Sequence, residues 1–217
     1  MNHTEIAWDC GSGNGQAAVN LAEIFNKVFA TDASAKQIEH AIIHKNVSYS
    51  VQPSENTNFH DSSFDCVTVA QAIHWFDLKK FYNEVNRVLK PGGLLCVWGY
   101  TWFKISDDID EIVEKTLITS LKDYWAPQTK LLQDGFKDLV LPYKQIVVPS
   151  FEIVVHWDLT QIISYLHSWS PMKSYGEKHG EKGMDLLFEG LIRVWGSKDK
   201  KRKISMPIYM KASKRDV

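Results

Sequence analysis

Short apolar runs alternate with amphipathic segments over the first hundred residues. The runs typical of strands are residues 6–10, 28–32, 47–52, 64–72 and 94–100. Between them, apolar residues recur at helical spacing, which predicts helices over residues 16–28, 34–44 (with Ser34 as N-cap) and 78–89. Strands that are apolar throughout and alternate with helices are typical of a parallel sheet covered on both faces. The pattern therefore predicts a doubly wound α/β fold.

The pattern changes after residue 100. Residues 106–125 predict a helix capped by Ser106, and residues 144–157 are strand-like but broken by Pro149, which indicates an edge strand or two short pieces. The remaining predicted elements are helices over 158–169 and 181–195 and a last strand over 203–213. Because no internal repeat or linker interrupts the chain, we expect a single domain over residues 1–217.

Composition narrows the partners of this domain. The formal net charge is −1, so no charge bias favours a nucleic acid or a membrane surface. We expect the basic run at 197–203 to be a solvated loop. No apolar run approaches the ~20 residues of a membrane span, and three cysteines are an odd number for a disulfide framework. We therefore expect a cytoplasmic protein.

A glycine loop follows the first predicted strand. Gly11, Gly13 and Gly15 alternate with other residues, and Asp9 stands two positions before the first glycine. The spacing is one residue short of the G-x-G-x-x-G of dinucleotide enzymes, and a carboxylate would repel a pyrophosphate. The loop favours a ligand with an ammonium group and no phosphate, such as S-adenosylmethionine (SAM), and disfavours an NAD-dependent dehydrogenase.

Polar residues follow the next three strands. Asp32 ends the second strand and could accept bonds from ribose hydroxyls, or act as a turn or capping residue. Ser54 and Glu55 follow the third strand, at the expected place of an adenine or simply in a polar loop. The fourth strand leads into a segment that holds Gln71, Ala72 and His74. His74 is the one catalytic candidate, and a structural histidine is the alternative.

Four segments carry a resemblance to a known family. They are DCGSGNG, ATD, SFDCVTVAQAIHWFD and RVLKPGGLL, all within residues 6–100. Together they resemble class I SAM-dependent methyltransferases of the methyltransferase type 11 group, especially trans-aconitate methyltransferase-like proteins. The resemblance implies a seven-stranded Rossmann-like sheet, mostly parallel with an antiparallel last strand and helices on both faces. It also implies a sixth strand near residues 151–157.

The resemblance also implies roles and boundaries. The glycines would hold the methionyl part of SAM with Asp9 on its ammonium side, Asp32 would hold the ribose, and Ser54 and Glu55 would flank the adenine. Gln71 and Ala72 would line the loop beneath the methyl donor. Residues 1–100 would form the SAM-binding core, 101–143 a lid insertion after strand five, and 144–217 strands six and seven with two inserted helices. The N-terminal arm of such proteins would be absent.

The expected function is transfer of a methyl group from SAM to a small molecule, with a carboxylate oxygen as the leading acceptor. A catalytically impaired SAM-binding protein is the alternative. Trp102, Trp125 and Trp169 could shape the substrate pocket or be core residues of helices. Histidines and cysteines show no metal-ligand spacing, so we expect no metal. Sequence leaves the oligomeric state open.

Overall fold

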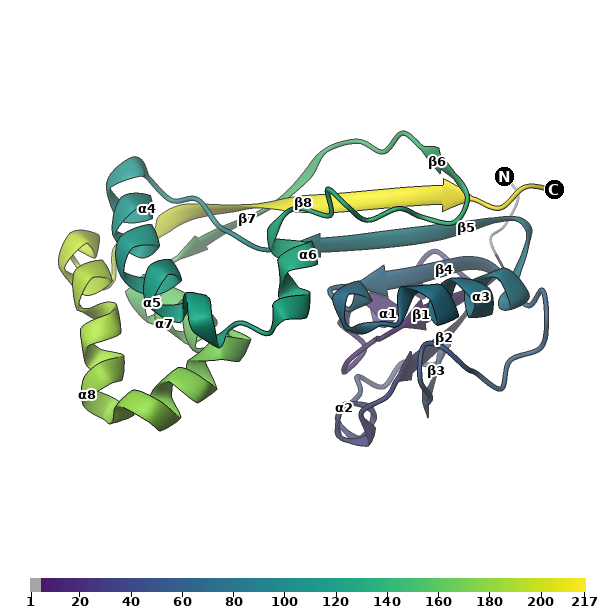
Figure 1. Cartoon of the computed structure of the whole chain (residues 1–217), viewed down its shortest axis with the longest axis horizontal. Coiled ribbons are helices and arrows are strands. Elements are labelled where there is room, and N and C mark those ends of the chain that lie inside the picture. Colours follow the sequence, from purple (N-terminus) through teal and green to yellow (C-terminus); the bar gives the residue numbers. More distant parts are fainter. Residues whose placement is uncertain (1–4) are drawn as a thin grey trace. The chain divides into compact units, whose positions relative to one another are not determined.

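The structure is a computed structural model that describes residues 5–217, and Figure 1 shows its elements. The chain forms two compact units, and β8 (Arg202–Lys214) contributes to both. Of the described residues, the first unit holds 5–100, 131–150 and 208–217, and the second holds 101–130 and 151–207. Residues 101–143, expected as one insertion, are thus divided between the units. The single-domain organisation stays a prediction.

The first unit contains a sheet and the helices that follow its strands. Its elements are β1 (Ile6–Cys10), α1 (Gln16–Leu21), β2 (Lys27–Asp32), α2 (Ala35–Glu39), β3 (Val47–Val51), β4 (Phe64–Ala70), the 3₁₀ turn η1 (Ile73–Trp75), α3 (Leu78–Val88), β5 (Leu89–Tyr100), α6 (Lys130–Gln133) and β6 (Lys144–Ile146).

The second unit is mostly helical. Its elements are α4 (Asp107–Val113), the π-helical η2 (Glu114–Ile118), α5 (Thr119–Leu121), the 3₁₀ turns η3 (Lys122–Tyr124) and η4 (Pro127–Thr129), β7 (Phe151–Trp157), α7 (Leu159–His167) and α8 (Ser170–Trp195).

The sheet has the order β3-β2-β1-β4-β5-β8-β6, with β7 paired to β8. Strands β1 to β5 pair in parallel, and β8 pairs antiparallel with β5. This arrangement confirms the predicted doubly wound fold with an antiparallel last strand. The sheet has eight strands rather than seven because the segment broken at Pro149 supplies both β6 and β7. The strand expected near residues 151–157 is present as β7, and β6 is an additional short strand that pairs with β8 in the first unit.

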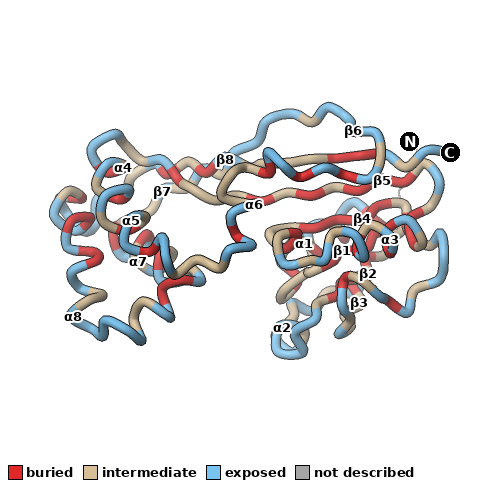
Figure 2. Tube along the Cα trace, viewed as in Figure 1, coloured by how far each residue is buried: buried red, intermediate tan, exposed pale blue. Residues whose placement is uncertain are grey.

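Both faces of the central strands are buried, which explains their continuous apolar sequence. Along β1, Trp8 and Cys10 belong to one apolar cluster and Ala7 to another on the opposite face. The α3 residues Phe81 and Val85 pack in the first cluster. Figure 2 shows the buried residues concentrated along β1 and β4 in the first unit. Successive side chains of a strand point to opposite faces, so both helical layers find apolar partners.

Two predicted helices are shorter in the structure. Helix α1 ends at Leu21, because the backbone then turns and β2 begins at Lys27, where it pairs with β1. Helix α2 ends at Glu39, although Ser34 accepts a bond from Gln37 N as the predicted N-cap. Beyond α2, Ile42 N donates to Asn14 O (2.9 Å), so long-range pairing ends the helix before residue 44.

Strand β5 begins earlier than residue 94. It starts at Leu89 and includes Pro91, Gly92 and Gly93, with a shift in the β4–β5 register. Gly92 has a φ of 77°, and the glycine pair forms a bulge that bonds to Arg215, the residue after β8, through Gly92 N to Arg215 O and Arg215 N to Gly93 O.

Details of the second unit also depart from expectation. The hydroxyl of Ser106 donates to Asp108 Oδ1 (2.6 Å) and makes no capping bond to α4. The predicted helix over residues 181–195 is present as the second part of α8. A further helical stretch begins at Ser170, and the two parts meet at Gly180, whose backbone (φ 66°, ψ −172°) only glycine adopts readily. In the described part of the chain, no helix is both long and apolar enough to cross a membrane.

Candidate functional site

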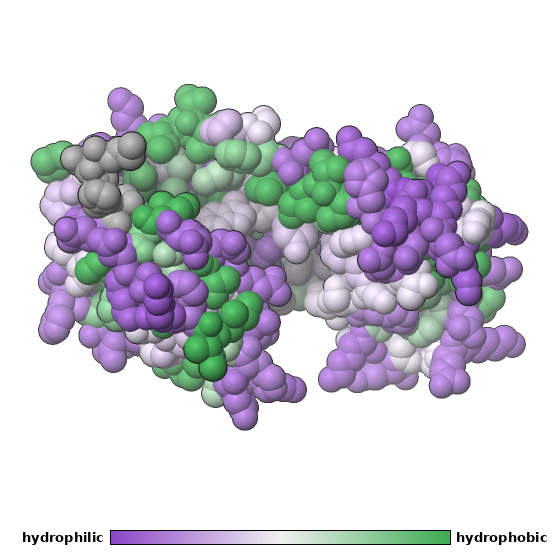
Figure 3. All heavy atoms as spheres, turned by 180° about the vertical axis from the view of Figure 1, so that it is seen from behind, coloured by the Kyte–Doolittle hydropathy of each residue, from purple (hydrophilic) through white to green (hydrophobic). Residues whose placement is uncertain are grey.

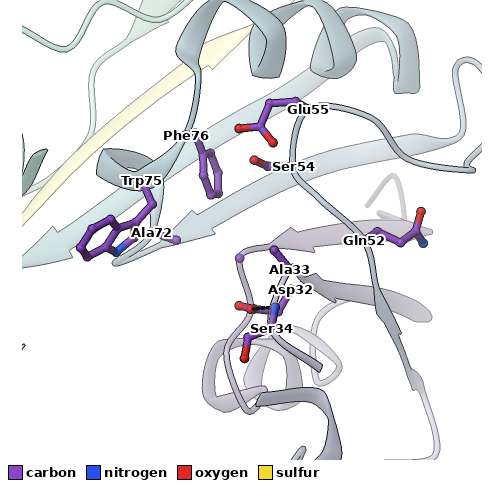
Figure 4. Close-up of a pocket in the computed structure, with 10 residues that line it drawn as sticks. Asp32, Ala33, Ser34, Gln52, Ser54, Glu55, Ala72, Trp75 and Phe76 are labelled. Carbon is purple, nitrogen blue, oxygen red and sulfur yellow. Dashed lines mark hydrogen bonds between the residues drawn. The ribbon is translucent and has the colours of Figure 1, made fainter. Parts of the chain in front are cut away.

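A cavity of about 300 Å³ lies in the first unit, where β1 to β4 end at their carboxyl edges. This is the edge where open parallel sheets bind ligands. The lining residues come from the loops after these four strands, and nine of them are labelled in Figure 4. They are Gly11, Asp32, Ala33, Ser34, Gln52, Ser54, Glu55, Ala72, Trp75 and Phe76.

The glycine loop brings backbone close to the cavity. The N–H groups of Gly11 and Ser12 both donate to Thr31 O, at 2.8 and 2.9 Å, which ties the loop to the end of β2. Gly11 has a φ of 69°, and a Cβ there would lie 2.6 Å from Ala72 Cβ. Gly15 has a φ of 90° and lies against Tyr49. The loop thus needs glycine both for its backbone angles and for close packing.

Gly11→Ala and Gly13→Ala form a matched pair. Both glycines have left-handed φ values, but a Cβ at Gly13 would meet only Gln37 Oε1, at 3.9 Å. We expect Gly13→Ala to lower the free energy of unfolding by about 1–2 kcal/mol, from backbone strain alone. Gly11→Ala should cost about 1–3 kcal/mol more because of overpacking against Ala72. Urea unfolding measures both, and equal losses would contradict the close contact at Gly11.

Asp32 joins the glycine loop to the loop after β2. Its Oδ2 accepts from Gly13 N (2.9 Å) and its Oδ1 accepts from Ser34 N (2.8 Å). Each oxygen keeps a further lone pair, and Asp32 lines the cavity. The carboxylate is therefore held in one orientation by two charge-assisted bonds, with capacity left for hydroxyl donors.

The opposite wall combines polar and aromatic groups. In Figure 4 the Phe76 ring points into the cavity between the Ser54–Glu55 segment and the Asp32 loop. Glu55 Oε1 accepts from the N–H of Asp77 (3.0 Å), which links the loop after β3 to the start of α3. Trp75 is 54% exposed at the rim. An apolar surface facing fixed polar groups is typical of a small-molecule site.

Asp9 lies in β1, directly before the glycine loop, and is fully buried. Its Oδ1 accepts from Thr68 Oγ1 (2.9 Å), and its Oδ2 has no hydrogen-bond partner among the described residues. Burial raises the pKa of Asp9 to about 7, the Thr68 bond opposes that rise, and the charge of Asp32 adds to it. An unpartnered buried carboxylate oxygen is costly unless a ligand or water pairs with it.

Of the three residues predicted for the site in the segment after β4, only Ala72 lines the cavity. The Gln71 side chain bonds instead to the backbone of Tyr100. His74 lies in η1 with its ring 4.8 Å from that of Trp75, and its buried Nδ1 has no partner in the described part of the chain. Burial lowers the pKa of His74, which keeps the imidazole neutral near pH 7.

The three predicted tryptophans meet in the second unit. Ring centroids of Trp102 lie 5.9 Å from those of both Trp125 and Trp169, and Trp125 lies 5.6 Å from Trp169. The buried Nε1 of Trp125 has no partner within residues 5–217. Their role at a substrate stays a prediction.

Structure brings together some predicted residues and adds others. Gly11, Asp32, Ser54, Glu55 and Ala72 line the cavity as a group, whereas Asp9 in β1 and the loop residues Gly13 and Gly15 are not among its lining residues. Sequence reasoning missed the other lining residues, which are Ala33, Ser34, Gln52, Trp75 and Phe76. All of them lie within a few residues of a predicted strand end, so that proximity was the available signal.

Comparisons with known proteins agree with this geometry. A family model described as a methyltransferase domain matches residues 8–97. A Dictyostelium discoideum protein named "Putative methyltransferase" is 32% identical over 218 residues, covering 98% of this chain and 83% of that protein. A solved structure described as a "Putative Type II Methyltransferase from Anaeromyxobacter dehalogenans" has a TM-score of 0.90 at 30% identity. That match covers 99% of this chain and 92% of the other.

A more distant likeness shows the fold alone. Haemonchus contortus phosphoethanolamine N-methyltransferase 2, solved with phosphomonomethylethanolamine and S-adenosylhomocysteine, gives a TM-score of 0.51 at 18% identity. The match covers 100% of this chain and 50% of the Haemonchus contortus chain. None of these three proteins is described as acting on trans-aconitate, so that finer resemblance stays a prediction. Full-length similarity to the first two, with the glycine loop and sheet order described above, shows that the chain belongs to the class I SAM-dependent methyltransferases.

Proposed function

We propose that the cavity at the ends of β1 to β4 binds SAM and that the enzyme methylates a small molecule, with a carboxylate oxygen as the acceptor. The single observation that carries the proposal is the hydrogen bond from Gly13 N to Asp32. It joins the glycine loop and the acidic strand end around one cavity. Bound SAM supplies a methyl group on a positively charged sulfur.

The residues present fit this cofactor. Gly11 packs closely against two other lining residues, since a Cβ there would lie 2.6 Å from Ala72 Cβ and 3.0 Å from Phe76 Cζ. The unpartnered Oδ2 of Asp9 supports the assignment of the cofactor ammonium to that side of the loop. Asp32 would orient the ribose through its remaining lone pairs, and the Phe76 ring would pack against the adenine near Ser54 and Glu55. These contacts would hold the cofactor in place. The rate of methyl transfer would then depend on how closely the acceptor atom is placed in line with the methyl group.

The acceptor assignment rests on protonation. A carboxylate is ionised at pH 7 and needs no general base, whereas an amine or a phenol must lose a proton. Among the ten cavity-lining residues there is no histidine or lysine, and the two carboxylates, Asp32 and Glu55, already accept hydrogen bonds from backbone N–H groups. Burial lowers the pKa of nearby His74, which makes it a weak base. This chemistry supports an acceptor that arrives already ionised.

Binding and turnover test the proposal separately. Calorimetric titration with S-adenosylhomocysteine tests the cofactor site, and absence of binding at millimolar ligand would contradict it. Transfer of labelled methyl groups to panels of carboxylic acids, amines and phenols tests the acceptor. Binding without transfer to any acceptor would favour the catalytically impaired alternative.

His74→Gln separates the acceptor classes. With a carboxylate acceptor we expect kcat to change less than about threefold and to stay flat between pH 6 and 9, because no proton is removed. With an amine or phenol acceptor that relies on His74, kcat should fall by about 10²-fold or more. A loss of that size, together with a rate that rises with pH, would contradict the carboxylate assignment.

A further inference from the structure

Gln71 has an unusual backbone for a residue at the end of a strand. It follows β4 directly with a φ of 57°, one of three non-glycine residues in the described chain with a positive φ. The left-handed conformation is unfavourable for a residue with a Cβ, and Gln has no local side-chain bond that would favour it as Asn or Asp does. Such a conformation persists only where surrounding contacts determine it.

Those contacts come from β5. Gln71 N donates to Trp98 O (2.9 Å), which continues the β4–β5 pairing past the end of β4. The side-chain Nε2 then donates to Tyr100 O (2.9 Å), and Oε1 accepts from Tyr100 N (3.3 Å). The side-chain amide thus takes the place that the next peptide group of β4 would occupy, while the backbone turns away.

A glycine makes room for this amide. A Cβ at Gly99 would lie 2.7 Å from Gln71 Oε1 and 2.5 Å from Leu132 Cδ1. Any side chain at Gly99 would therefore displace the amide or the neighbouring Leu132. Three parts therefore act together at the carboxyl end of the β4–β5 pair. They are the Gln71–Tyr100 hydrogen bonds, the left-handed backbone of Gln71 and the absence of a side chain at Gly99.

These three parts lie at the start of the segment that lines the cavity. Ala72 follows Gln71 directly, and Trp75 and Phe76 lie on the turn that comes next. From this the geometry points to Gln71 as a positioning residue: its amide anchors β5 at Tyr100 so that the backbone can turn and present residues 72–76 to the cofactor. The inference rests on the proposed function, and it differs from direct contact between Gln71 and SAM.

Two variants remove the amide in different ways. Gln71→Met keeps the length of the side chain without its polar atoms, and Gln71→Gly removes the side chain and relieves the backbone strain. Ser62→Gly is the control, because Ser62 also has a left-handed φ (49°) but lies before β4. The measurements are amide hydrogen exchange at Tyr100, the Kd for S-adenosylhomocysteine and the midpoint of thermal unfolding.

We expect both Gln71 variants to speed exchange at Tyr100 about tenfold without ligand and to raise the Kd about tenfold. In Gln71→Gly the unfolding midpoint should stay close to that of the parent protein, because strain relief offsets the lost bonds. Ser62→Gly should change neither exchange nor affinity. Loss of affinity without loss of fold distinguishes positioning from a purely structural role.

Three results would overturn the inference while the parent protein binds ligand. Unchanged exchange at Tyr100 would mean that the amide does not hold β5, even where affinity falls. Faster exchange with unchanged affinity would make the pair purely structural. An equal effect of Ser62→Gly would assign the changes to strain. If the parent protein itself binds no S-adenosylhomocysteine, the proposed function fails first and this inference fails with it.

Discussion

Replacement of Asp32 by alanine is expected to weaken binding of S-adenosylhomocysteine by about 100-fold or more. The variant loses two charge-assisted bonds to backbone N–H groups, those of Gly13 and Ser34. These two bonds lie within the protein, so their loss lowers its stability and releases the glycine loop. The loss of affinity comes from the proposed bonds of the carboxylate with the ribose hydroxyls, because bonds to charged groups contribute about 1.5–3 kcal/mol each and each 1.4 kcal/mol is a factor of ten in affinity. Calorimetric titration measures the change in Kd.

Asp65→Ala is the matched control for Asp32→Ala. Asp65 also accepts backbone N–H bonds, from Ile6 (2.9 Å) and Glu5 (3.2 Å), but it lies near the start of β4, whereas the cavity lies where the strands end. Both variants should lower the unfolding midpoint, and only Asp32→Ala should lose affinity. Similar affinities for the two variants would contradict a cofactor role for Asp32.

Asp9 should make the stability of the ligand-free protein depend on pH. Because burial raises its pKa from 3.8 to about 7, the native protein keeps this proton up to pH 7 while the unfolded chain loses it near pH 4. Unfolding therefore releases a proton between these values, and the free energy of unfolding falls as pH rises through that window. The fall attributable to Asp9 is about 4 kcal/mol and ends above pH 7.

Asp9→Asn should remove this contribution, because an amide does not titrate. Urea unfolding at pH 5 and pH 8 should therefore show a steeper fall in the parent protein than in Asp9→Asn. Asp65→Asn is the control and should keep the steeper fall between these pH values, since Asp65 bonds to Lys90 and to backbone N–H groups. Equal slopes in the parent protein and Asp9→Asn would show that Asp9 does not hold a proton at pH 5.

Cofactor binding should be coupled to the loss of the proton from Asp9. An ammonium group beside Asp9 favours the carboxylate, so below pH 7 binding must release the proton. The Kd for S-adenosylhomocysteine in the parent protein should then fall by up to tenfold for each pH unit between 5 and 7. In Asp9→Asn the Kd should be larger at pH 8 and should not show this dependence.

Local sequence pattern was enough for the strands near the site. Residues 6–10 form β1 as predicted, and Asp32 ends β2, because an apolar run bounded by glycine or a polar residue fixes a buried strand without outside help. The same logic located Gly11, Ser54 and Glu55 near one sheet edge. Helix lengths were predicted less well, since contacts such as Ile42 N to Asn14 O ended α2 before its local pattern ended.

The amino-acid sequence by itself determined the order of strands and helices in the first hundred residues, the glycine loop and the acidic residue at the end of β2. These follow from periodicity and backbone preference, which act over a few neighbouring residues. Only the tertiary structure decided that burial raises the pKa of Asp9 to about 7 and that Gln71 bonds to Tyr100, 29 residues away. Both depend on burial and on partners that distant segments supply, and neither is encoded in the spacing around the residue itself.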